Sequence, residues 1–287
     1  MQQKNKDKKG LVLEGGAMRG LFTAGILDVM MENDIKPDGI IGVSAGAAFG
    51  CNYKSNQSGR ALRYNMRFAN DNRYCSLRSL LLTGNIFNAD FAYHTVPTRY
   101  GIFDNETFES NPMEYYLVCT DVCTGKAVYK KCEQGGHPFF EWVRASASMP
   151  VVSRAVNIDG QLLLDGGVAD SIPLQYFEGI GYNQNLVILT QPDGYVKHQP
   201  KLMPAIRFFL RKYPNMADAM AMRHKMYNKQ IEFVKQAEKE GRCIVIRPET
   251  RLPIGHLSHD ADEMKRVYDI GRQTAIKRID EIKAFFE

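Results

Sequence analysis

Short apolar runs rich in β-branched residues recur along this chain, and helical stretches lie between most of them. The runs cover residues 10–13, 39–43, 115–119, 162–164, 186–189 and 243–246. Strands that alternate with helices form βαβ units, whose parallel strands are buried beneath helices. The sequence therefore predicts an α/β fold with a largely parallel sheet and helices on both faces.

Two regions depart from this alternation. Residues 155–158 and 161–164 flank the turn pair Asp159-Gly160, which predicts a β-hairpin over 156–164. After residue 199 the composition shifts to helical stretches over 202–240 and 260–286, while the run 243–246 ties this part to the sheet. Asp260, with Glu263 three positions later, is typical of a capped helix start.

The composition is that of an ordinary globular protein, with 44% hydrophobic and 24% charged residues. The net charge of +5 indicates no nucleic-acid partner. The lysines within residues 1–9 predict a solvated tail, with attraction to an anionic membrane surface as the alternative. The apolar run after this tail is too short for a signal peptide, and no window reaches the roughly 18 apolar residues of a membrane span. We therefore expect a soluble, cytoplasmic protein, with peripheral membrane contact as an option.

The six cysteines lack Cys-x-x-Cys spacing, so we expect free thiols. Cys119, Cys123 and Cys132 are the only group considered for a metal, but the first two flank an expected strand end. No metal and no cofactor is predicted.

Ser44 lies at the centre of Gly42-Val43-Ser44-Ala45-Gly46, directly after an apolar run. This pattern is typical of a nucleophile elbow, in which a strand turns sharply into a helix and the serine projects in a strained conformation. The first amides and the dipole of the following helix then point toward the serine. The pentapeptide also occurs in chains that catalyse nothing, so the other motifs decide its interpretation.

A glycine-rich segment, residues 14–20, follows the first expected strand and opens a helix expected over 19–32. Amides without helical partners at such a position bind anions. The segment is interpreted as a phosphate cradle, as an oxyanion hole for an intermediate formed at Ser44, or as a purely structural turn. The phosphate cradle fits poorly, because neither Gly-x-Gly-x-x-Gly nor the Walker pattern is present.

Asp165 is the candidate base for Ser44. It ends an apolar run and precedes two glycines, so we expect it beyond the carboxyl end of a strand, where parallel sheets display ligand-binding groups. The alternative is a turn aspartate bonded to nearby amides. A third segment, residues 144–150, suits a close-packed helix end beside a site, or simply a helix that Pro150 stops.

Together, residues 15–20, 42–46, 145–150 and 165–167 resemble the patatin-like phospholipase family, as do Thr120-Asp121 with Gly125 and residues 170–173. The resemblance implies a three-layer α/β/α sandwich and hydrolysis of lipid acyl esters by a Ser-Asp dyad through an acyl-enzyme. It makes Ser44 the nucleophile and Asp165 the base. The implied oxyanion donors are the amides of Gly15, Gly16, Ala17 and Met18. The implied supporting or substrate-binding residues are Arg19, Gly20, Gly42, Gly46, Gly166 and Gly167.

The resemblance also divides the chain into a flexible basic tail over 1–9, a catalytic domain over 10–198 and a mainly helical C-terminal extension over 199–287, as in bacterial members. The chain departs from the family's triple glycine at Ala17, which resists a positive φ, so the identity of the oxyanion donors stays open. Three roles stay open for Arg19: steering a substrate phosphate, stabilising developing charge, or tying the loop to the sheet.

Two other functions are compatible with the sequence. The chain order Ser44, Asp165, His256 allows a Ser-Asp-His esterase of the α/β-hydrolase type, although that fold places more strands before its serine. The other is a catalytically silent lipid-binding protein with the same fold. For the hydrolase we expect an apolar cleft near Ser44 and an acyl-ester substrate, with no prediction for head group, chain length or oligomeric state.

Three apolar sets are expected in the core, with contact to acyl chains or a membrane as the alternative. They are residues 205–213, Leu80-Leu81-Leu82 and the methionines Met203, Met216, Met220, Met222 and Met226.

Overall fold

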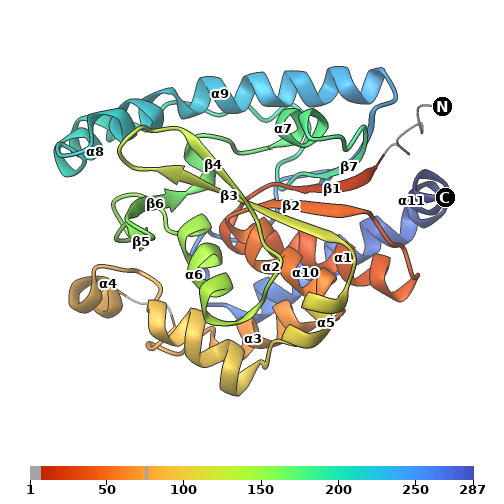
Figure 1. The fold of residues 1–287 in the computed structure, drawn as a ribbon, viewed down its shortest axis with the longest axis horizontal. Coiled ribbons are helices and arrows are strands. Elements are labelled where there is room, and N and C mark those ends of the chain that lie inside the picture. Colours follow the sequence, from red (N-terminus) through yellow and green to blue (C-terminus); the bar gives the residue numbers. More distant parts are fainter. Residues whose placement is uncertain (1–7, 75–76) are drawn as a thin grey trace.

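The computed structural model describes residues 8–74 and 77–287. A β-sheet forms the middle layer and helices cover both of its faces (Figure 1). The strands are β1 (Lys9–Leu13), β2 (Gly39–Val43), β3 (Glu114–Asp121), β4 (Ala127–Lys131), β5 (Val156–Ile158), β6 (Gln161–Asp165), β7 (Gln184–Ile188) and β8 (Cys243–Ile246).

The α-helices are α1 (Gly20–Glu32), α2 (Ala45–Lys54), α3 (Arg60–Phe68), α4 (Leu77–Thr83), α5 (Asn105–Ser110), α6 (Gly136–Ser146), α7 (Leu174–Gly179), α8 (Met203–Phe209), α9 (Pro214–Lys239), α10 (Ala261–Lys277) and α11 (Ile279–Phe286). Two short 3₁₀ helices, η1 (Ala17–Arg19) and η3 (Gly166–Val168), follow β1 and β6. A π-helix, η2 (Phe91–Tyr100), precedes α5.

The sheet has a parallel centre and an antiparallel margin. β1 pairs in parallel with β2 and β7, β2 with β3, and β7 with β8. β4 is antiparallel to β3, and β5 and β6 form an antiparallel hairpin. At its turn, Asp159 and Gly160 have φ angles of 50° and 83°, the left-handed pair that a type I′ turn requires. The expected parallel sheet and hairpin are both confirmed.

Alternate side chains of the parallel strands point to opposite layers of helices. Leu11 and Leu13 of β1 pack with α1, α2 and α10, whereas Val12 packs with α7 and α9. Figure 1 accordingly has α7 and α9 on one side of the sheet, and α1, α2, α6 and α10 on the other. The three-layer α/β/α architecture with a helical C-terminal part is therefore confirmed.

The C-terminal part of the chain contributes to all three layers. β8 extends the sheet, α9 covers one face, and α10 packs closely on α1 at the other. The close approach depends on two glycines. A Cβ on Gly271 would lie 2.0 Å from the Phe22 carbonyl oxygen, and one on Gly25 would lie 2.2 Å from the Tyr268 carbonyl oxygen.

The helix expected over 260–286 consists of two helices, α10 and α11, which meet at Arg278. Asp260 caps α10, since its side chain accepts hydrogen bonds from the amides of Asp262 and Glu263. The Glu263 carboxylate accepts from the Ser258 hydroxyl at 2.6 Å. The expected N-cap is therefore confirmed.

The start of the described chain is partly built into the sheet. Lys9 begins β1, and Lys8 forms an ion pair with Glu114 at 2.9 Å, so these two residues of the expected tail are held at the sheet. Residues 1–7 lie outside the described residues. Across the ranges 8–74 and 77–287, no helix is long and apolar enough to cross a membrane. The cysteines at 51, 119, 123, 132 and 243 are free thiols, and Cys75 lies outside the described residues.

Candidate active site

Ser44 occupies a sharp turn between β2 and α2. Its φ of 55° and ψ of −120° are strained for a residue with a side chain, as expected of a nucleophile elbow. The following helix passes close to β1, because a Cβ on Gly46 would lie only 2.5 Å from the Leu13 carbonyl oxygen. Gly42 is equally confined, with Ala47 backbone atoms 2.7 Å from its Cβ position. Both glycines therefore make the turn sterically feasible.

The last residues of β2 and β6 pair with two consecutive residues of β3. Val43 pairs with Val118, and Asp165 pairs with the next residue, Cys119. Because β4 pairs with both Val118 and Cys119, β2 and β6 share the other side of β3. Asp165 was expected beyond the end of a parallel strand. That detail is wrong, since β6 is antiparallel to β3 and meets β2 end to end.

Backbone and side-chain contacts hold Asp165 in place. The residue is 5% exposed, and its Oδ1 accepts a hydrogen bond from the Gly167 amide at 2.7 Å. The Thr120 hydroxyl donates to the Asp165 carbonyl oxygen at 2.8 Å. A Cβ on Gly166 would lie 2.2 Å from the Val118 carbonyl oxygen, so only glycine allows η3 to pass this close to β3.

The environment of Asp165 favours proton uptake. Burial raises the pKa of its carboxyl group above the ordinary aspartate value. The positive charge of Arg223, the Ser44 side chain and the Gly167 amide lower this pKa only in part. A carboxylate with a raised pKa is a better base for a serine hydroxyl than an exposed aspartate.

Ser146 links the elbow to the sheet. Its hydroxyl accepts a hydrogen bond from the Ser44 amide at 3.0 Å and donates one to the Val118 carbonyl oxygen at 2.7 Å. Ser146 is the last residue of α6 and belongs to the segment 144–150, for which the sequence left two interpretations open. Its contacts favour a position beside the site over a simple helix end.

The glycine-rich loop packs directly on the elbow. A Cβ on Gly15 would lie 3.0 Å from the Ser44 Cβ, and one on Gly20 would lie 2.8 Å from the Ala45 Cβ. Ala17 has a φ of 49°, in the left-handed region that its side chain was expected to resist. The amides of Ala17 and Met18 stand at the start of η1, ahead of the Arg19 amide that donates to the Gly16 carbonyl oxygen. The two amides therefore belong to a free helix start beside Ser44.

Glu14 anchors this loop, and the sequence analysis did not identify it. The residue is 3% exposed, and its carboxylate accepts hydrogen bonds from the Thr190 amide at 2.6 Å and the Tyr227 hydroxyl at 2.9 Å. Gly16 packs on the same threonine, whose hydroxyl would lie 2.7 Å from a Cβ there. The available signal was an acidic residue placed directly between a wholly apolar strand and two glycines.

His256 is held by Arg19. The Arg19 Nη1 donates to His256 Nε2 at 2.7 Å, and within the described residues no hydrogen bond joins His256 to Ser44 or Asp165. Partial burial, with the positive charges of Arg19 and three other basic side chains, lowers the pKa of His256 to about 4. A neutral imidazole that accepts from Arg19 does not form the Ser-Asp-His arrangement that the chain order allowed.

An apolar cavity of about 940 Å³, open solvent included, begins at Ser44. It confirms the expected cleft. Its walls include Ala17 and Met18 of the loop and apolar side chains of α2, α3 and α6: Ala48, Phe49, Tyr64, Phe140 and Val143. The apolar lining of this cavity suits an acyl chain.

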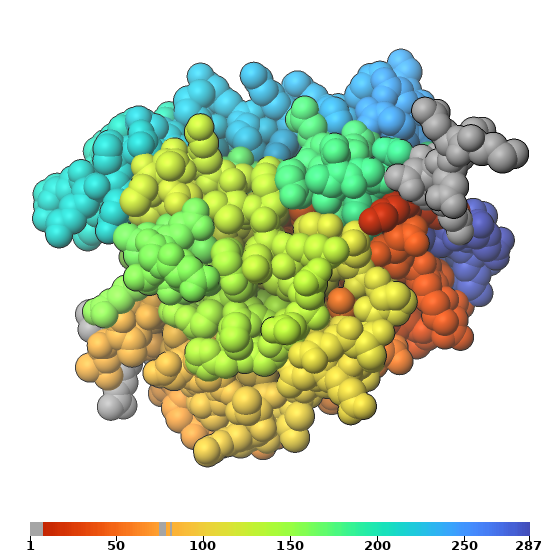
Figure 2. Space-filling view, in the orientation of Figure 1, coloured from red at the N-terminus to blue at the C-terminus, as the bar shows by residue number. Residues whose placement is uncertain are grey.

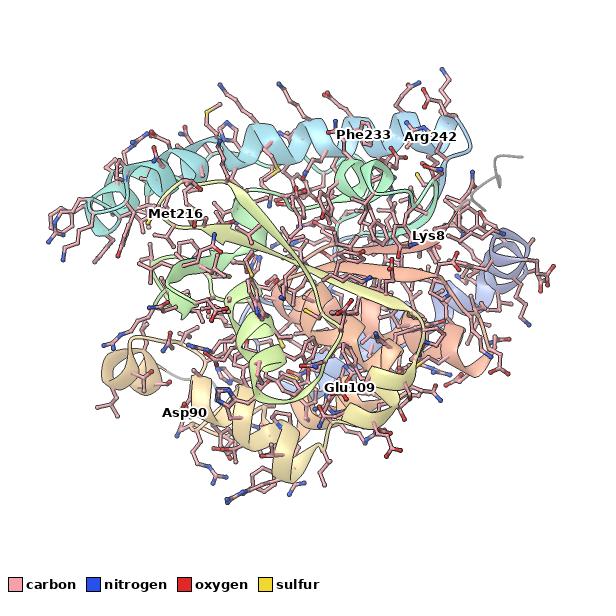
Figure 3. The ribbon with its side chains drawn as sticks, in the orientation of Figure 1. Lys8, Asp90, Glu109, Met216, Phe233 and Arg242 are labelled. Atoms are coloured by element: carbon pink, nitrogen blue, oxygen red, sulfur yellow. The ribbon has the colours of Figure 1, made fainter. Side chains whose placement is uncertain are left out.

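The three apolar sets that the sequence analysis named do not line this cavity. Met203, Met216 and Met220 are buried in the core beside Val122 and Leu164 (Figure 3 labels Met216). Met222 is exposed, and Met226 is partly buried on α9. Leu80 packs on a core cluster, Leu82 is exposed, and the Leu81 side chain lies outside the described part. In residues 205–213, Leu210 is buried whereas Phe208 and Phe209 are exposed.

One group of the described residues brings metal-ligand atoms together. His94, His137 and Glu141 have such atoms within 4.8 Å of one another. The Glu141 carboxylate already binds His94 Nε2 at 2.9 Å and the Arg144 guanidinium, and the two imidazoles stack at 4.1 Å. These contacts account for the cluster as an ion-pair network between η2 and α6.

Two family models match the chain. The model described as patatin-like phospholipase matches residues 11–178, more than half of the chain, and a domain of unknown function (DUF6363) matches residues 213–287. The uncharacterized protein YjjU of Escherichia coli (strain K12) is 29% identical over 64% of this chain and 52% of its own length. Lysophospholipase nte1 of Aspergillus terreus is 24% identical over 96% of this chain and 18% of its own length.

The crystal structure of VipD from Legionella pneumophila aligns with 96% of this chain and 67% of its own at 12% identity, with a TM-score of 0.44. The chain thus spans about half of the bacterial relative and a fifth or less of the fungal one. The family match covers the strained serine, the glycine-rich loop and Asp165 in one continuous segment. The chain belongs to the patatin-like phospholipase family.

Proposed function

We propose that this protein is a serine acyl hydrolase that cleaves carboxylic ester bonds of lipids through a dyad of Ser44 and Asp165. The observation that carries the proposal is the meeting of a strained elbow serine and a buried carboxylate at the facing ends of β2 and β6. The lysophospholipase names of fungal relatives support a lipid substrate.

In the proposed reaction, the Ser44 hydroxyl attacks the ester carbonyl carbon and its proton passes to Asp165. The negative oxygen of the tetrahedral intermediate accepts hydrogen bonds from the free amides at the start of η1. The carbon–oxygen bond to the alcohol then breaks, the alcohol takes the proton from Asp165, and an acyl-enzyme remains on Ser44. Water attacks this ester while Asp165 takes a proton from it, and Asp165 then returns this proton to the Ser44 oxygen as the carboxylic acid leaves.

The loop amides carry much of the proposed rate enhancement. A single donor in an oxyanion hole contributes about 3 to 4 kcal/mol of transition-state stabilisation. Ala17 and Met18 are the favoured donors, since their amides precede the first hydrogen bonds of η1 and both residues line the cavity with Ser44. In this arrangement the acyl chain lies in the apolar cavity and the ester carbonyl lies against the loop.

We also propose peripheral contact with membranes through α8. Leu202 is 71% exposed, and Phe208 and Phe209 are 63% exposed each, while Arg207 and Arg211 lie on the same short segment. Figure 2 shows this segment projecting at one end of the molecule. Exposed aromatic groups next to cationic ones favour an anionic lipid surface. The free thiols of the described cysteines fit a reducing, cytoplasmic compartment.

Cosedimentation with anionic phospholipid vesicles tests the membrane contact. Replacing Phe208 and Phe209 by serine is expected to reduce the bound fraction severalfold. Ile276→Ser, which removes an exposed apolar side chain from α10, is the matched control and retains binding. Equal vesicle binding by the Phe208/Phe209 variant and by Ile276→Ser would show that α8 does not contact the membrane.

Labelling with a fluorophosphonate, followed by hydrolysis of a panel of neutral esters and lipids, tests the hydrolase itself. The wild-type protein is expected to label at Ser44, and Ser44→Ala to lose both labelling and hydrolysis. Ser153→Ala is the matched control, because Ser153 also lines the cavity. A folded wild-type protein that binds lipid but neither labels nor hydrolyses any ester would be the silent lipid-binding alternative.

A further inference from the structure

Four basic side chains gather beside Asp165 and the glycine-rich loop, and we call them the cationic rim: Arg19, Lys197, Arg223 and His256. Arg19 contacts His256, as described above, and Arg223 Nε donates to the Gly167 carbonyl oxygen at 2.6 Å. A Cβ on Gly167 would lie 3.0 Å from Asp165 Oδ1 and 3.2 Å from Arg223 Nη2. The guanidinium of Arg223 therefore stands next to the carboxylate of the proposed dyad.

The three charged side chains of the rim, Arg19, Lys197 and Arg223, form no ion pair within 4 Å among the described residues, although the carboxylates of Asp165 and Glu14 lie nearby. The Arg19 Nε is buried without a hydrogen-bond partner. The nearby Glu14 carboxylate accepts hydrogen bonds from uncharged Thr190 and Tyr227 instead. Three clustered positive charges that are not held in ion pairs favour the binding of an anion.

Lys197 is fixed at the rim. Its amide donates to the Asn228 side chain at 2.9 Å, and its carbonyl oxygen accepts from the same side chain at 3.0 Å. The ammonium group lies 4.3 Å from the centroid of the Tyr227 ring. Tyr227 in turn donates to Glu14 of the glycine-rich loop, so the position of Lys197 is tied to that of the loop.

We propose that the cationic rim binds the phosphate group of the ester substrate, at a site that the glycine-rich loop shares with the C-terminal domain. The inference rests on the proposed hydrolase function and assigns the residues that hold the head group at that site. No rim residue lines the apolar cavity, whereas Ser44 does, so the acyl chain and the phosphate occupy separate regions with the ester between them. Guanidinium groups suit phosphate because they donate two parallel hydrogen bonds to its oxygens.

The C-terminal domain supplies half of this rim. Arg223 on α9 and His256 before α10 both lie within residues 213–287, which match the domain of unknown function. His256 acts as a positioning residue, since its neutral Nε2 accepts from Arg19 and orients that guanidinium. The role inferred for this domain is therefore to complete the head-group side of the active site.

Two esters that differ only in the phosphate test the inference: 1-octanoylglycerol and 1-octanoylglycerol 3-phosphate. The wild-type protein is expected to show at least about a tenfold higher kcat/KM for the phosphate-bearing ester, and the preference decreases as salt screens the charges. Lys197→Met is expected to remove most of this preference through KM. Lys201→Met, a substitution of an exposed lysine in the same segment, is the matched control and retains it.

Inorganic phosphate is the second probe, and it separates a free-phosphate site from a lipid head-group site. Competitive inhibition of neutral-ester hydrolysis by millimolar phosphate, weakened in Lys197→Met, supports the rim. Strong phosphate inhibition without any preference for the phosphate-bearing ester indicates a site for free phosphate and overturns the inference. Equal kcat/KM for the two esters, or an equal effect of Lys197→Met on both, also overturns it. If the wild-type protein hydrolyses neither ester, the proposed hydrolase function itself is refuted.

Discussion

Ser44 and Asp165 stand at the facing ends of two strands that run in opposite directions along one side of β3. The spacing of the two residues does not require this, because 120 residues separate them, and these residues include five α-helices and the π-helix η2. The two residues come together because the pairing of β2 with β3 ends at Val118. The hairpin strand β6 then pairs with β3 from the next residue, Cys119. The buried Asp165 carboxylate thus comes next to the elbow serine, as the proposed dyad requires.

Replacing Asp165 by asparagine tests this arrangement. Without a base, kcat is expected to fall by about 10² to 10⁴, whereas His256→Ala affects neutral-ester hydrolysis far less. Hydrolysis of 1-octanoylglycerol by the purified variants is the measurement. His259→Ala serves as a second histidine control, since His259 binds the Ala69 carbonyl oxygen away from the dyad. A loss of activity in His256→Ala as large as in Asp165→Asn would support the triad.

The same substitution has a separate effect on stability. Because burial raises the pKa of Asp165, its carboxyl group binds a proton more tightly in the folded than in the unfolded chain. Ionised Asp165 therefore costs stability above the usual aspartate pKa of about 3.9. This cost shrinks as pH falls below the raised pKa of the folded chain and disappears below about 3.9. Asp165→Asn is expected to match or exceed the wild-type Tm at pH 7. The difference should shrink near pH 4, and a lower Tm of the variant at pH 7 would contradict this account.

Ser146 provides a test of positioning. Ser146→Ala leaves the Ser44 amide and the Val118 carbonyl oxygen without their shared partner, which destabilises the fold by about 1 to 3 kcal/mol. We expect kcat to fall about tenfold with little change in KM, because the nucleophile loses its fixed orientation. Ser148→Ala is the control, since the Ser148 hydroxyl donates to the Arg144 carbonyl oxygen and the backbone hydrogen bonds of Ser148 do not depend on its side chain. Steady-state kinetics with equal effects of the two substitutions would deny Ser146 this role.

Local patterns were sufficient to predict the parallel strands, the hairpin turn and the elbow. Each depends on neighbouring residues, such as the positive φ of Gly160 or the glycines around Ser44. The apolar run before Asp165 and the two glycines after it also predicted the candidate base, but not the direction of its strand. That direction is set by pairing with β3, which the local sequence does not encode.

Contacts between distant segments could not be predicted in this way. Ser146 lies 102 positions from Ser44, and Tyr227 lies 213 positions from Glu14. The rim needs residues from four separate segments, and the sequence singled out only Arg19 and His256 among them. Lys197 and Arg223 are ordinary basic residues in their own contexts, and only the packed fold brings all four to one place.

The close packing of α1 on α10, which Gly25 and Gly271 allow, predicts an effect on stability. Gly271→Ala places a methyl group 2.0 Å from the Phe22 carbonyl oxygen, so the helices must move apart. Such overpacking costs about 1 to 3 kcal/mol, which corresponds to a decrease in Tm of roughly 3 to 10 °C for a chain of this size. Differential scanning calorimetry measures it. Gly179→Ala, where no atom lies within 4 Å of the new Cβ, is the control, and an equal Tm for both variants would exclude a tight crossing.

The pH dependence of substrate preference follows from Lys197. Burial, with the positive charge of Arg223, lowers the pKa of Lys197 to about 8. The charged and titratable groups around it are Glu14, Asp165, Arg19, Arg223, His256, Tyr195 and Tyr227. Lys197 is protonated below its pKa and loses its charge above it, so phosphate binding weakens as pH rises through about 8.

A phosphate monoester gains its second charge near pH 6. The ratio of kcat/KM for 1-octanoylglycerol 3-phosphate to that for 1-octanoylglycerol should therefore rise through pH 6 and fall above pH 8. Taking the ratio cancels the titration of Asp165, which acts on both esters alike. In Lys197→Met the fall of this ratio above pH 8 should disappear. Its rise through pH 6 should remain, because that rise comes from the ionisation of the substrate phosphate. A wild-type ratio that stays constant from pH 7 to pH 9.5 would show that Lys197 does not contact the phosphate.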